Sequence, residues 1–344
     1  MNWILARSEE TSSERVAPDG VLHLANAFRG AKVLMSAVEL GVFTELAGGP
    51  LSLETLRRHI DIHERGTRDF LDALAAMGLL VRDAHGRYAN TPEADRYLVE
   101  GSSSYIGGWF EHLGAHEYPN WHLLTKALQT GEPQIASDSL YSHLYMESDQ
   151  VAAFARAMSG ATVLVARELA TAFRWRDYGT FVDVGSAEGC LPVEVARRHP
   201  HLVGVGFDLP PLREVFERNV SRNGLASRLR FQGGNFLSDE LPEGDVLVLG
   251  RVLHNWNLKK KKLLLRKARA AVRPGGAVIV YERFINDSRS NAAGLLASLN
   301  MLVMTSGGFD YSAADCIQWM AEAGFKDMAL TSVTADQSML VGLT

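Results

Sequence analysis

The chain has 344 residues, of which 47% are hydrophobic and 22% are charged, and its formal net charge is −5. This length and composition are typical of a globular protein with one large domain or two domains. Nucleic-acid binding requires clustered lysine and arginine, so the negative balance argues against it. We therefore expect no nucleic acid or other phosphate-rich partner.

Two observations bear on the cellular compartment. The opening stretch 1–10 has a short apolar core with acids directly behind it, unlike a secretory signal, and no run approaches the roughly 18 apolar residues of a membrane span. The only cysteines are Cys190 and Cys316, and neither has a Cys-x-x-Cys partner. We interpret both as small core residues. The sequence predicts a protein of the reducing cytoplasm with no membrane attachment.

The region from about Val21 to Leu98 predicts a small helical unit with a hairpin wing. Ser52 is placed to cap one helix, and Thr67 is the expected start of a second helix that ends at Gly78. The residues that follow alternate in polarity around a turn at His85 and Gly86, which indicates a β-hairpin. This order of elements is that of a winged helix.

The charge of the winged helix bears on its partner. Between Leu51 and Asp72, four arginines face five acids, a local net charge of −1. Such a surface would not be drawn to a phosphate backbone. The helices around residues 25–46 carry more aliphatic surface than this unit can bury alone, which favours a homodimer contact.

Beyond a bridging region from Gly101 to about Arg176, strands and helices alternate. Strands are expected over 181–184, 201–207, 229–232, 245–250 and 277–281, with a helix over 261–272 and closing strands over 328–334 and 338–343. Strict alternation specifies an α/β fold with a mainly parallel sheet and helices on both sides.

The stretch 180–196 is a buried strand, a glycine turn and a helix, and this turn is where a cofactor would bind. A dinucleotide fingerprint requires Gly-x-Gly-x-x-Gly, but counting from Gly185 the second and third glycine positions hold Ala187 and Cys190. Asp183 and Glu188 place carboxylates beside the turn, where they would repel a diphosphate and tolerate an ammonium group. S-adenosylmethionine therefore fits this turn better than NAD.

A second strand ends at Asp208, about 20 residues past the glycine turn, where a carboxylate can accept hydrogen bonds from ribose hydroxyls. Asp208 could alternatively cap the helix ahead of Pro210 and Pro211. We prefer the ribose role because strand, turn, helix, strand and acid occur in the expected order.

Two ionisable residues follow later strands. His254 lies just past the strand 245–250, and Glu282 ends the strand 277–281; in open parallel sheets ligands bind at this edge. A histidine with an ordinary pKa near 6.5 can act as a general base, and a carboxylate on its other ring nitrogen would fix the tautomer. Alternatively, His254 packs against Trp256 and Glu282 caps a loop.

Six motifs occur in succession along the chain. They are Asp183-Val-Gly-Ser-Ala-Glu-Gly, Phe207-Asp-Leu-Pro, Gly234-Asn-Phe, Arg251-Val-Leu-His-Asn-Trp, Arg273-Pro-Gly-Gly and Ala323-Gly-Phe. Together they resemble the dimeric S-adenosylmethionine-dependent small-molecule O-methyltransferases, which include plant caffeate-type enzymes, acetylserotonin methyltransferases and bacterial natural-product tailoring enzymes. The resemblance covers nearly the whole chain. It implies a winged-helix dimerisation domain over 1–112 and a Rossmann-like methyltransferase domain over 113–344.

The resemblance also implies roles for individual residues. His254 would be the general base, with Glu282 and Asp310 as its flanking acids. The acceptor pocket would be lined by Asn300, Met301 and Met304. The cofactor would be held by Asp183, Gly185, Gly189, Asp208, Leu209, Gly234, Asn235, Phe236 and Arg251.

The chain departs from the family pattern at several positions. Ser186 and Ala187 stand in a loop that is usually richer in glycine, and Asp310 is one methylene shorter than the glutamate typical of plant members. Other replacements are Asn235 and Asn255 for frequent aspartates and Arg251 for a frequent lysine.

Two other features carry no assigned function. His112 and His116 have a spacing that can hold a metal on a helix, but no third ligand is in register. We therefore predict no metal there. The run of lysines over 259–262 is interpreted as a solvated helix face.

The expected reaction is methyl transfer to a hydroxyl of a small, aromatic acceptor. Alternatives are C- or N-methylation, with a metal at His254 in one version, and a non-catalytic cofactor-binding protein. Trp109, Phe110, Trp121 and Phe154 are candidates for the acceptor lining, although each could equally be core.

Overall fold

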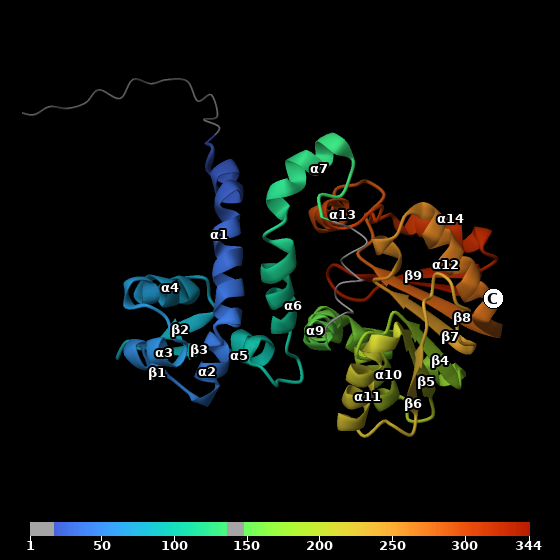
Figure 1. The fold of residues 1–344 in the computed structure, drawn as a ribbon, viewed down its shortest axis with the longest axis horizontal. Coiled ribbons are helices and arrows are strands. Elements are labelled where there is room, and N and C mark those ends of the chain that lie inside the picture. The colour runs from blue at the N-terminus through green and yellow to red at the C-terminus, as the bar shows by residue number, and fades with distance from the viewer. Residues whose placement is uncertain (1–16, 136–147) are drawn as a thin grey trace, which may run out of the picture.

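The computed structural model describes residues 17–135 and 148–344. The predicted absence of a signal in residues 1–10 therefore falls outside the described part. Figure 1 shows the N-terminal elements on one side and the large sheet with its helices on the other, with helices α6 and α9 between them.

The N-terminal part is the predicted winged helix. Its elements are α1 (Asp19–Glu39), α2 (Val42–Glu45), β1 (Leu51–Ser52), α3 (Leu53–His59), α4 (Glu64–Ala76), β2 (Leu80–Arg82), β3 (Arg87–Asn90) and α5 (Pro92–Leu98). The strands form a small antiparallel sheet in the order β1-β3-β2. Ser52 caps α3 as expected, since its side chain accepts a hydrogen bond from the Thr55 N–H.

Helix α4 begins earlier than predicted. The expected start was Thr67, but the helix starts at Glu64, and His63 is the cap that accepts from the Arg65 N–H. Thr67 is fully buried, and its hydroxyl donates to the His63 carbonyl at 2.9 Å. A threonine that bonds back to the carbonyl four residues earlier is tolerated inside a helix, so its cap-like sequence signal was misleading.

The bridging region connects the two parts. It contains α6 (Gly107–His112), a π-helical turn (Leu113–Glu117), α7 (Leu124–Thr130) and the long α9 (Ser148–Ala172), which packs against both α6 and α10. Helix α6 passes into the π-helical turn without a break. The domain boundary after residue 112 stays a prediction.

The C-terminal part is built on a seven-stranded sheet in the order β6-β5-β4-β7-β8-β10-β9. The strands are β4 (Thr180–Val184), β5 (Val203–Asp208), β6 (Leu229–Gly233), β7 (Gly244–Gly250), β8 (Val272–Glu282), β9 (Lys326–Ser332) and β10 (Ser338–Leu343). The first five in this order pair in parallel, and β10 is antiparallel to β8 and β9. The order reverses between β4 and β7, which is where ligands bind in such sheets.

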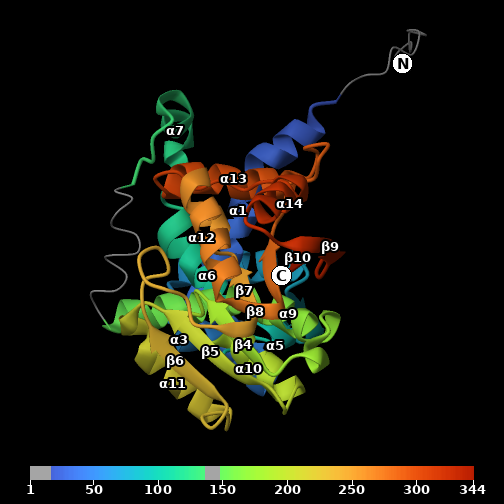
Figure 2. The same cartoon turned by 90° about the vertical axis from the view of Figure 1, so that its right-hand side faces the viewer.

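Helices cover both faces of this sheet (Figure 2). They are α10 (Cys190–Arg198), α11 (Arg213–Arg222), α12 (Leu258–Ala271), α13 (Ala292–Met304) and α14 (Ala313–Glu322). Alternate strand residues point to opposite cores: Phe181 and Val248 pack with α9, α10 and α11, whereas Val182 and Leu249 pack with α12 and α14. The two-sided burial explains why the strands are continuous apolar runs.

Helix α12 corrects two expectations. It begins at Leu258 under an Asn257 cap, three residues before the predicted start. The lysine run is not wholly solvated, because Lys261 is fully buried. Lys261 lies on the same helical stripe as Leu264, Leu265 and Ala268, which all face the core.

Candidate active site

The glycine turn after β4 has a backbone conformation that its sequence makes possible. Gly185 has φ +81°, and a Cβ there would lie 2.7 Å from the Val252 side chain. Ala187 also has positive φ, and its N–H donates to Asp208 Oδ2 at 2.9 Å. The turn is thereby tied to the end of the neighbouring strand β5.

Asp208 combines the two roles that the sequence left open. Its Oδ2 holds the glycine turn, and its Oδ1 accepts the Leu209 N–H at 2.8 Å ahead of Pro210. Burial raises the pKa of Asp208 to about 6, against the lowering effect of these two backbone bonds. Each carboxylate oxygen has a second lone pair for a ligand hydroxyl.

Asp183 stands beside Asp208 as a second buried acid. Burial, and then the charge of Asp208, raise the pKa of Asp183 to about 8. Within the ranges that the structure describes, neither acid has a cationic side chain within ion-pair distance. A positively charged ligand would therefore find a favourable field here.

A cavity of about 560 Å³ opens above the turn. Predicted cofactor residues that line it are Asp183, Gly185, Asp208, Leu209, Asn235, Phe236 and Arg251, whereas Gly189 and Gly234 do not. Gly189 has a supporting place at the start of α10, because its φ is +81° and a Cβ would lie 2.6 Å from the Phe216 ring. Cys190 also lines the cavity, so it is not the simple core residue that we expected.

The chemistry of this lining fits S-adenosylmethionine. The acids suit an ammonium group and ribose hydroxyls, and the Phe236 ring is a flat apolar surface suited to an adenine. Arg251, at φ +52°, holds its guanidinium 5.1 Å from the Trp109 ring centroid and supplies a cation for a carboxylate. Ser186 Oγ is buried without a hydrogen-bond partner in the chain, so it can also serve a ligand.

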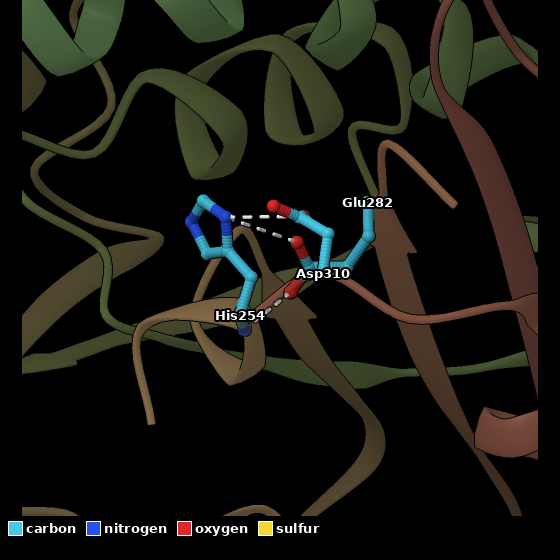
Figure 3. A group of neighbouring side chains, drawn as sticks. All are labelled: His254, Glu282 and Asp310. Carbon is cyan, nitrogen blue, oxygen red and sulfur yellow. Dashed lines mark hydrogen bonds and ion pairs between the residues drawn. The ribbon is translucent and has the colours of Figure 1, made fainter. Parts of the chain in front are cut away.

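Three ionisable side chains meet at the edge of the sheet (Figure 3). His254 lies in a short 3₁₀ turn after β7, Glu282 ends β8, and Asp310 precedes α14. The Nδ1 atom of His254 lies 3.4 Å from Asp310 Oδ1 and 3.9 Å from Glu282 Oε2. The His254 backbone N–H also donates to Glu282 Oε1 at 3.3 Å, which fixes the turn against β8.

The acids control the protonation of the imidazole. Burial alone disfavours the imidazolium, but the Glu282 and Asp310 carboxylates outweigh it and raise the pKa of His254. Burial also raises the pKa of Glu282, which the charge of His254 partly offsets. A histidine whose Nδ1 is engaged by acids has its basic lone pair on Nε2.

Sequence models now identify the family. A model of the O-methyltransferase domain matches residues 121–326, and a model of the O-methyltransferase dimerisation domain matches residues 22–100. The chain belongs to the O-methyltransferase family.

Individual relatives agree with this assignment. The tetracenomycin polyketide synthesis 8-O-methyl transferase TcmO of Streptomyces glaucescens is 41% identical over 94% of this chain and 96% of its own. The N,N-dimethyltransferase OxyT of Streptomyces rimosus is 36% identical over 89% of this chain and 90% of its own. The structure of human N-acetylserotonin methyltransferase in complex with S-adenosylmethionine aligns with a TM-score of 0.90 and 28% identity, over 97% of this chain and 99% of that one. The O-methyltransferase thus uses S-adenosylmethionine and methylates a small acceptor.

The predicted acceptor residues of the O-methyltransferase are only partly brought to the cavity. Met304 lines it, whereas Asn300 and Met301 are buried on the preceding turns of α13. Of the four aromatic candidates, Phe154 lines the cavity and Trp109 lies under Arg251. Trp121 donates to Asn300, and Phe110 packs with the N-terminal core.

Sequence reasoning missed the contribution of α9. Met158, Ser159 and Thr162 line the cavity beside Phe154. Their helical spacing marks a shared face, but only the packing of α9 against α10 shows that this face borders the cofactor turn.

Metal binding has one geometric candidate in the O-methyltransferase. Within residues 17–135 and 148–344, the three side chains His254, Glu282 and Asp310 alone could surround an ion, with one atom from each within 4.8 Å of the others. The rings of His112 and His116 lie 4.8 Å apart without a third ligand. Burial lowers the pKa of His112 to about 4, so this pair adds no cation at neutral pH. In the same described ranges, no helix is long and apolar enough to cross a membrane.

Proposed function

We propose that this O-methyltransferase methylates a phenolic hydroxyl of a small polycyclic aromatic acceptor, with His254 as the general base. The observation that carries the proposal is the approach of two buried acids to one ring nitrogen of His254. This arrangement leaves Nε2 to take the hydroxyl proton and stabilises the imidazolium that results.

The remaining residues bind and orient. S-adenosylmethionine supplies, when bound, a methyl group on a positively charged sulfur. Asp183 and Asp208 would hold the cationic and ribose parts, and Arg251 the carboxylate. Phe154 and Met304 would close the cavity around the reacting groups and exclude water. Rate acceleration would come largely from alignment of the acceptor oxygen with the methyl group.

The acceptor class rests on the relatives. TcmO is named for methylation in tetracenomycin polyketide synthesis, so we propose an aromatic polyketide of secondary metabolism as the substrate. The name of OxyT makes N-methylation the second candidate. An amine of ordinary pKa near neutrality loses its proton without help, whereas a phenol with a pKa near 10 benefits from a base; the acids beside His254 favour the hydroxyl.

The deciding experiment replaces His254 with alanine. We expect turnover of a phenolic acceptor to fall by roughly 10²- to 10⁴-fold, with the S-adenosylmethionine dissociation constant within about twofold of wild type by calorimetry. His122→Ala, at an exposed position in the bridging region, is the matched control. Unchanged turnover in the His254 variant would remove the general-base role.

We propose that the enzyme is a homodimer. The dimerisation domain leaves a row of large apolar side chains exposed on α1: Val21, Leu24 and Phe28 are 74%, 77% and 53% exposed. They recur at helical spacing on one face, which a second copy would cover. The two free cysteines are consistent with the reducing cytoplasm as the proposed compartment.

A further inference from the structure

Lys261 is a cation held in the protein interior next to the candidate catalytic acids. Its side chain is 0% exposed in the first turn of α12, although Lys259 of the same run is exposed. The ammonium donates a 2.7 Å hydrogen bond to the Phe309 carbonyl and lies 3.6 Å from the Phe309 ring centroid. Burial of a charge is costly unless nearby charges compensate for it, so this position calls for a counter-charge.

The counter-charges are the acids that face His254. Glu282 and Asp310 are 1% and 5% exposed, and Glu282 Oε2 and Asp310 Oδ2 are buried with no hydrogen-bond partner. Two carboxylates beside a neutral imidazole leave the interior with an excess of negative charge. The field of both carboxylates acts on Lys261 and opposes the effect of burial, which lowers the pKa of this lysine.

Lys261 also holds the segment that carries Asp310. The Phe309 carbonyl accepts from Lys261, and the Phe309 N–H donates to the His254 carbonyl at 2.9 Å. The next residue is Asp310, whose carboxylate reaches His254 Nδ1. Helix α12, the His254 turn and the acid are therefore linked through one peptide unit.

We propose that Lys261 is the internal counter-cation and positioning residue of the Glu282 and Asp310 pair. This inference rests on the proposed role of His254 as the base. With both acids ionised and Lys261 charged, the group has one excess negative charge while His254 is neutral and none once His254 has accepted a proton. The reaction would thus proceed toward electrical balance in the buried group, which stabilises the imidazolium.

The same cation bears on the metal alternative. An ion between His254, Glu282 and Asp310 would add positive charge beside a buried ammonium. The other groups that face this cluster are Arg251, which is cationic, and Tyr311 and Cys316, whose pKa values are raised by burial so that both stay neutral. The chain's own charges therefore favour a proton site.

The test compares pH profiles of kcat at saturating substrates for wild type, Lys261→Met, Lys261→Gln and the exposed control Lys259→Met. Removal of a positive charge makes proton uptake by the cluster easier, so the acid limb should move upward by about one pH unit. The deficit of both Lys261 variants should be largest near pH 6 and shrink toward pH 8, with cofactor affinity within twofold of wild type. Glutamine can still donate to the Phe309 carbonyl, so it separates the charge from the hydrogen bond.

Several outcomes would overturn the inference. A loss of equal size at every pH would mean that Lys261 is only structural, and an unchanged acid limb in Lys261→Gln would remove the charge argument. If Lys261→Met does not fold, Lys261→Gln and the charge-keeping Lys261→Arg carry the test; a limb that moves equally in these two excludes charge as the cause. Activity lost on chelation and restored by iron or zinc would favour a metal. If His254→Ala keeps full turnover, the proposed function fails instead, whatever the Lys261 variants do.

Discussion

The indole N–H of Trp121 donates a 2.8 Å hydrogen bond to the side-chain oxygen of Asn300, although 179 residues separate them. The bond fixes the orientation of the Asn300 amide, whose NH₂ group bonds the carboxyl of Glu117. Three separate segments thereby meet beside the predicted acceptor residues.

Trp121→Phe removes only the donor of this bond. If Asn300 shapes the acceptor pocket, the KM for the acceptor should rise about fivefold, the equivalent of one ordinary hydrogen bond, while the cofactor dissociation constant is unchanged. Steady-state kinetics and calorimetry measure the two constants. Trp175→Phe is the control, because it removes an indole hydrogen bond of 3.0 Å to the Leu169 carbonyl in the core of the sheet; an equal KM effect there would refute the pocket role.

Cofactor affinity should depend on pH through two acids. The pKa values of Asp208 and Asp183 are raised to about 6 and about 8 because both are buried. A cationic ligand binds the ionised forms, so affinity should fall as pH drops through this window, by about tenfold or more between pH 8.5 and 5.5.

Stability of the free chain should change in the opposite direction. A raised carboxyl pKa means that the folded state holds its proton longer than the unfolded state, so the contribution of these acids is lost as pH rises through the folded pKa. The rise in Tm on adding S-adenosylhomocysteine, which keeps the ammonium group, should therefore grow with pH. Asp208→Asn should flatten the dependence, and a Tm shift that is constant with pH would contradict the assignment.

Gly185→Ala tests the cofactor turn. The added Cβ meets both a positive φ and the Val252 side chain at 2.7 Å, so we expect a loss of about 1–3 kcal/mol in unfolding free energy together with weaker cofactor binding. Gly275→Ala is the matched control, since its φ is +78° but the space around it is open. Equal effects on cofactor binding would show that backbone strain alone, and not contact at the turn, is responsible.

The dimer proposal predicts a surface-specific effect. Leu24→Glu combined with Phe28→Glu should convert a dimer to a monomer in analytical ultracentrifugation, because charges on that face of α1 cannot be buried without a partner. Leu330→Glu, at an exposed position that is 50% accessible on β9, should leave the dimer intact. A double variant that remains dimeric would place the interface elsewhere.

The sequence by itself determined the features that depend on neighbouring residues. Apolar runs between glycines predicted strands such as β4, the cap at Ser52 predicted α3, and acids at strand ends predicted Asp208 and Glu282 on one edge. These inferences succeed because side-chain periodicity and strand polarity are local properties, and parallel strands bring their carboxyl ends to a common edge.

The tertiary structure alone decided which distant residues meet. No spacing in the chain shows that Lys261 is buried while Lys259 is exposed, that Trp121 bonds Asn300, or that α9 borders the cofactor turn. Each depends on how helices pack on the sheet, where a rotation of one residue along α12 would exchange a solvated charge for a buried one.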